Sequence, residues 1–158
     1  MSISQNARFE VEAPADAEFS NPPGAGLARV LFQELRGTGW STGDLKNWRD
    51  CGWAFTVSDN KAYLLIALAR SRKKGESVLR KVECTLRHDE WMLQIVPQRS
   101  PGLITRLFGS KRSADRPDVF RLASSVREIL KSKLNYEHPL WRRNGYPTES
   151  ISSNEPEM

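Results

Sequence analysis

The fold is decided by residues 53–69, Trp53-Ala-Phe-Thr-Val-Ser-Asp-Asn-Lys-Ala-Tyr-Leu-Leu-Ile-Ala-Leu-Ala69. Trp53, Phe55 and Val57 alternate with smaller or polar residues, which is the period of a half-buried strand. The polar residues after Val57 predict a turn, and 62–69 is an unbroken apolar run suited to the middle of a sheet. These residues therefore predict two adjacent antiparallel strands.

Two more strands are predicted further along the chain. Residues 78–87 and 91–97 both alternate in the period of a strand, and a basic connection at 70–75 precedes the first of them. Clear alternation in these strands indicates an antiparallel sheet that is covered mainly on one face.

Helices are predicted on both sides of this region. Residues 26–36 place leucines and a valine on one helical face, and Gly37 and Gly39 follow. The second helix is expected to begin at Asp115, with Pro117 in its first turn and an apolar stripe from Val119 to Leu130. The predicted class is α+β: an antiparallel four- to five-stranded meander sheet with an N-terminal and a C-terminal helix packed on one face, as a two-layer sandwich. The expected core contains Trp53, Phe55, Leu65, Val82, Leu93, Ile95, Val126 and Ile129.

The 158 residues divide into one predicted domain and two polar ends. Residues 1–23 are predicted to be a flexible acidic segment, 24–146 a single α+β domain, and 147–158 a disordered tail. The net charge of +5 is concentrated in the body, because acidic side chains predominate at both ends. A basic body attracts nucleic acid, anionic surfaces or acidic proteins.

The sequence contains neither a transmembrane segment nor the pattern of a secretory signal. Cys51 and Cys84 have no metal-type spacing, so reduced thiols and a cytoplasmic location are expected.

Two clusters of basic residues are candidate contacts for nucleic acid or another anion. One is Arg70, Arg72, Lys73 and Lys74, and the other is Arg106, Lys111 and Arg112. Clustered cations neutralise phosphates and release counterions. The alternative is that they only solvate loops and protect a sheet edge.

A second candidate surface combines aromatic residues with arginine after the last helix. Its members are Tyr136, Trp141, Arg142, Arg143 and Tyr146. This composition is typical of protein-binding hot spots. The same residues could instead fold back over the sheet edge, with Trp141 as an anchor.

An enzyme would require Cys51 to meet His88 or His138 as a base, and the sequence contains no motif that supports this. We expect no enzymatic activity and no cofactor. The sequence therefore favours a small non-enzymatic adaptor or regulatory protein that binds another protein, of the immunity or chaperone type. The alternative is an accessory protein that binds nucleic acid or an anionic surface through its basic face.

Overall fold

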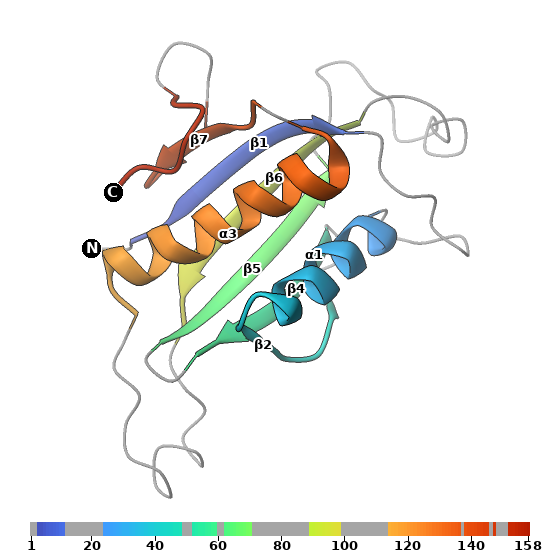
Figure 1. Ribbon diagram of the computed structural model, residues 1–158, viewed down its shortest axis with the longest axis vertical. Coiled ribbons are helices and arrows are strands. Elements are labelled where there is room, and N and C mark those ends of the chain that lie inside the picture. Colours follow the sequence, from blue (N-terminus) through green and yellow to red (C-terminus); the bar gives the residue numbers. More distant parts are fainter. Residues whose placement is uncertain are drawn as a thin grey trace, which may run out of the picture.

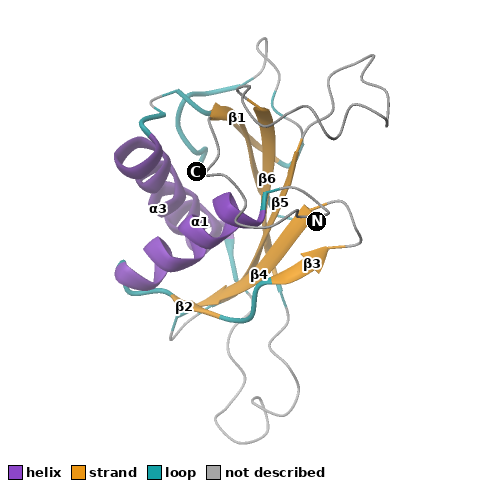
Figure 2. Ribbon diagram, turned by 90° about the vertical axis from the view of Figure 1, so that its right-hand side faces the viewer, coloured by secondary structure: helices purple, strands orange, loops and turns teal. Residues whose placement is uncertain are grey.

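The computed structural model describes residues 3–11, 24–48, 52–59, 62–70, 89–98, 114–136, 138–145, 147 and 152–158. Within these ranges, seven strands form one antiparallel sheet and two helices cover one face of it (Figures 1 and 2). In chain order, the elements are β1 (Gln5–Val11), α1 (Ala25–Gly37), β2 (Ser41–Thr42), β3 (Lys46–Trp48), β4 (Gly52–Ser58), β5 (Tyr63–Arg70), β6 (Asp89–Pro97), α3 (Arg116–Leu134) and β7 (Leu140–Arg143). The predicted α+β class is confirmed, with more strands than the four or five expected.

The strand order across the sheet is β2-β4-β5-β6-β1-β7, and β3 also pairs with β4. β4 and β5 are adjacent antiparallel strands, as the sequence predicts. Phe55 pairs with Ile66, and Val57 pairs with Leu64. All four side chains are buried. They form the layer that meets the helices.

The strand predicted at 91–97 is β6, and one of its neighbours in the sheet is β5. β5 pairs directly with β6 from Leu64 to Arg70, so the two are neighbours in the sheet. The strand predicted at 78–87, and with it the core residue Val82, lies outside the described residues.

The N-terminal prediction was wrong for residues 5–11. They form β1, which lies between β6 and β7 in the sheet. Ala7 and Phe9 are buried beneath the helices, while Arg8 and Glu10 alternate with them on the opposite face. The burial of Phe9 and the ladder hydrogen bonds to β6 along the whole strand and to β7 over Gln5–Arg8 offset the entropy lost on ordering this polar segment.

The C-terminal prediction was wrong for residues 152–158. Ser153 forms an isolated antiparallel bridge with Trp141 of β7, with N–O distances of 2.7 and 3.0 Å. The structured part of the chain therefore extends beyond the predicted boundaries of 24 and 146 at both ends.

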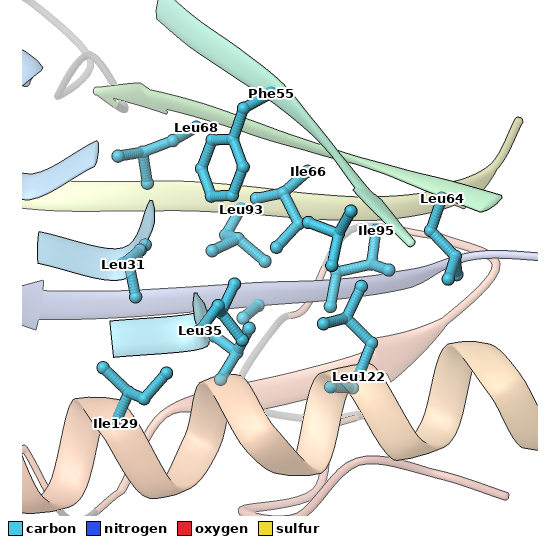
Figure 3. Packing of buried hydrophobic residues seen from close by; sticks show 14 of the residues in the cluster. Leu31, Leu35, Phe55, Leu64, Ile66, Leu68, Leu93, Ile95, Leu122 and Ile129 are labelled. Carbon is cyan, nitrogen blue, oxygen red and sulfur yellow. The ribbon is translucent and has the colours of Figure 1, made fainter. Parts of the chain in front are cut away.

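The core lies between the sheet and the two helices (Figure 3). Leu31 and Leu35 of α1 and Leu122 and Ile129 of α3 point toward the side chains of the central strands. Five predicted core residues are buried: Phe55, Leu93, Ile95, Val126 and Ile129. Trp53 is only half-buried against this core. Leu65 is half-buried as well, and it lies on the opposite face because it alternates with Leu64 and Ile66.

Helix α3 begins with the capping interactions that its sequence predicts. The Asp115 carboxylate accepts a hydrogen bond from the Asp118 backbone N–H at 3.2 Å, and the Asp118 carboxylate accepts one from the Asp115 N–H at 3.0 Å. This reciprocal capping box satisfies two donors that the helix itself leaves unpaired.

We expect Asp115→Ala to lower the free energy of unfolding by about 1 kcal/mol, because one of these donors loses its acceptor. Urea denaturation followed by circular dichroism measures the change. Asp115→Ser should retain most of the stability, since serine also caps helices. Equal losses in the two variants would contradict a capping role for the side chain.

Candidate functional site

The structure separates the predicted cluster of aromatic and arginine residues. Trp141 is fully buried in β7, where it pairs with the buried Ala7. Arg142 and Arg143 are half-buried and point to opposite faces, because neighbouring residues of a strand do so. Tyr136 packs near Phe9, with ring centroids 6.2 Å apart. Tyr146 lies outside the described residues. Trp141 is thus an anchor of the sheet edge and not a surface contact.

The basic candidates fall mostly outside the described residues. Arg70 is described as the half-buried last residue of β5. The remaining candidates, Arg72, Lys73, Lys74, Arg106, Lys111 and Arg112, are not described. The alternative hypothesis that these residues contact nucleic acid or an anionic surface stays a prediction.

The residues considered for thiol catalysis also lie largely outside the described ranges. Cys51 and His88 belong to this undescribed part, while His138 is exposed after α3. Among the described residues, no group of three or more His, Cys, Asp or Glu side chains is arranged to hold a metal ion.

The most distinctive surface is the sheet face opposite the two helices, which we call the open face. Residues paired across antiparallel strands point to the same side of the sheet. One row across this face runs from Ala54 through Ala67 and Gln94 to Asn6, and the next runs from Gly52 through Ala69 and Met92 to Arg8. Among the described elements, both helices lie on the other side (Figure 2).

Small residues hollow the open face at its centre. Because alanine and glycine occupy four neighbouring positions on β4 and β5, larger side chains on the flanking strands stand above them. The result is a cavity of about 80 Å³. Its lining residues are Asn6, Trp48, Ala67, Ala69, Met92, Leu93 and Gln94. Leu65 and Val96 are paired in the adjoining row and extend the apolar area.

Basic side chains border the open face at both edges of the sheet. Lys46 lies on β3 and is exposed, and Arg142 lies on β7. Between these edges, Arg8 and Glu90 form an ion pair with an N–O distance of 2.9 Å. Glu10, at the end of β1, is a further acidic side chain on this face. One basic side chain thus stands at each edge of the open face, and the area between them contains the Arg8–Glu90 ion pair and Glu10.

Sequence reasoning missed this site, although part of its signal was present. The small residues Ala67 and Ala69 alternate with the larger Ile66 and Leu68, which indicates a face with small side chains. Because all four residues are apolar, the sequence does not distinguish this face from the core face. The hollow depends on which residues of β3 and β6 stand beside these alanines. That information lies in the register between strands and not in any one segment.

The chain matches no protein-family model, and comparison with curated proteins and with solved structures finds no match either. Among the described residues, neither helix has the length and apolar character needed to cross a membrane.

Proposed function

We propose that this protein is a non-enzymatic adaptor or regulatory protein that binds another protein through its open face. The observation that supports the proposal is the hollowed apolar area between Trp48 and Met92. Contiguous apolar surface with a polar border is typical of protein-binding sites. Tryptophan is enriched among hot-spot residues, and methionine adapts to the shape of a partner.

The partner that this face suits presents an apolar side chain surrounded by acidic groups. The apolar side chain would enter the hollow beside Trp48. The acidic groups would meet Lys46 and Arg142 at the two edges. A second copy of this chain is a poorer occupant, because it would bring the same basic side chains together. We place this interaction in the cytoplasm, with both cysteines reduced and no cofactor.

The proposal predicts that Trp48→Ala weakens binding about 30-fold or more, the size of a typical hot-spot effect of about 2 kcal/mol. The tagged full-length chain is first used to capture partners from native lysate, with nuclease and at raised salt. A single captured protein is then purified, and its Kd for wild type and variant is measured by calorimetry. Lys131→Ala, on the exposed side of α3, serves as the control and should leave the Kd unchanged.

Three results would overturn the proposal. The captured protein could bind Trp48→Ala as tightly as wild type. The chain could instead associate with itself through this face. Nucleic acid could be the species recovered, with a steep loss as salt rises, which would match counterion release by the basic clusters.

A further inference from the structure

The outer edge of β7 contains a second surface, distinct from the open face, against which another part of the chain packs. Residues 152–158, which we call the C-terminal segment, lie along this edge. The segment packs beside β7 near β1 and α3 (Figure 1). Pro156 of the segment is buried. Its contacts show what kind of chain the edge accepts.

Part of the recognition is made to the backbone of the segment. Trp141 and Ser153 exchange both backbone hydrogen bonds, at 2.7 and 3.0 Å. The Gln5 side-chain amide donates to the carbonyl of Glu157 and accepts from its N–H at 3.4 Å. Gln5 is 1% exposed, so its buried amide is satisfied by backbone groups of the segment. The segment bends at Asn154 and Glu155, so these contacts hold a short bent chain through its backbone, whatever its side chains.

The remaining contacts involve both backbone carbonyls and acidic side chains of the segment. The Arg143 backbone N–H donates to the Glu157 carboxylate at 3.2 Å, and the Arg143 guanidinium donates to the Met158 carbonyl oxygen at 2.7 Å. Arg127 of α3 donates to the Asn154 carbonyl at 3.2 Å and pairs with Glu155 at 3.5 Å. Two arginines therefore flank a path along which glutamates lie.

The C-terminal segment meets the edge of β7 at two backbone N–H groups. β7 is the last strand in the sheet order, and Trp141 and Arg143 are two residues apart, so both backbone N–H groups point outward from the edge. Trp141 is paired with a backbone carbonyl, whereas Arg143 is paired with a side-chain carboxylate. The segment thus supplies both acceptors at this edge, one from its backbone and one from an acidic side chain.

We propose that the β7 edge, with Gln5, Arg127 and Arg143, is a binding site for a short acidic segment of another protein, and that the C-terminal segment occupies it as an intramolecular competitor. Because the competitor belongs to the same chain, its local concentration is high, and it lowers the apparent affinity for any external peptide. Weakening the competitor should therefore increase binding of an external acidic peptide.

The test uses the full-length chain and a fluorescent peptide, Ser-Ser-Asn-Glu-Pro-Glu-Met, that copies residues 152–158. The double variant Glu155→Lys/Glu157→Lys repels its own segment from Arg127 and Arg143, but keeps the edge intact. We expect it to bind the peptide at least tenfold more tightly than wild type in fluorescence anisotropy. Adding Arg143→Glu to the double variant should abolish this gain. A peptide with lysine at both glutamate positions should not bind.

A hydrogen-exchange measurement on the wild-type chain gives a second criterion that does not depend on any variant. The Ser153 amide should exchange much faster than the Ile66 amide of β5, because a displaceable segment opens without unfolding the core. Equal protection of the two amides would overturn the proposal. It would also be overturned if the double variant bound the peptide no better than wild type, or if the lysine peptide bound equally well. Trp48→Ala should leave peptide binding unchanged, so failure here is separate from failure of the proposed function.

Discussion

Replacing Trp141 with alanine is expected to lower the free energy of unfolding by about 3–5 kcal/mol. The side chain is fully buried and belongs to the hydrophobic core between the sheet and the helices. It also lies in β7, a strand of only four residues in which it is the one fully buried side chain. Removal of the indole would leave a large cavity at the edge of the sheet and loosen the strand that holds the C-terminal segment.

Two further variants test the cause of this loss. Trp141→Phe should retain part of the stability, because the indole N–H has no hydrogen-bond partner among the described residues and phenylalanine keeps most of the apolar ring. Trp48→Ala should be much less destabilising, since Trp48 is half-buried on the open face. Urea denaturation followed by circular dichroism compares the three. If Trp141→Ala kept its stability but lost partner binding, the residue would be a surface contact, as the sequence suggested.

The elements predicted best are those whose signals are local. α3 has a capping residue, a proline in the first turn and an apolar stripe within one segment, and its structure matches all three. The hairpin of β4 and β5 has alternation, a turn and an apolar run in adjacent residues. No distant partner is needed to recognise either of them.

The elements that were missed depend on distant partners. β1 is polar and the C-terminal segment is polar and acidic, and each is held by residues from the other end of the chain. Gln5 and Glu157, for example, are hydrogen-bonded across 152 positions of sequence. Local composition favoured disorder in both segments. Ala7 and Phe9 alternate with charged residues, which is the pattern of a strand. The prediction of a flexible segment relied on the polar composition instead.

The candidate site was misjudged for a related reason. Aromatic and arginine residues after the last helix resemble a hot spot when only composition is considered. Pairing with β1 divides them instead between two faces and buries Trp141. The hollow of the open face arises only when four strands are brought together. The register between strands determines both the burial of Trp141 and the hollow of the open face, and no single segment encodes that register.

Gly24→Ala is expected to destabilise the fold by about 2–5 kcal/mol, because two unfavourable effects act at one position. Gly24 is the N-cap of α1, and its φ of 103° lies in the left-handed region that side chains with a Cβ rarely adopt. An added Cβ would also lie 2.5 Å from the Cζ3 atom of Trp91, a ring that is almost fully buried. Neither the helix start nor the ring can shift freely, since both are packed into the core.

Two other glycines separate these effects. Gly39 has a φ of 89°, but its Cβ would meet nothing within 4 Å, so Gly39→Ala should cost only the backbone strain of about 1–2 kcal/mol. Gly37 lies at the end of α1 with no positive φ and no neighbour within 4 Å of its Cβ. Gly37→Ala should be neutral or stabilising by up to about 1 kcal/mol, because alanine reduces the entropy of the unfolded chain. Urea denaturation of the three variants should rank Gly24→Ala as the most destabilised. If Gly24→Ala and Gly39→Ala lost the same stability, Trp91 would have room for the methyl group, and the contact with Gly24 would not determine how α1 packs on the sheet.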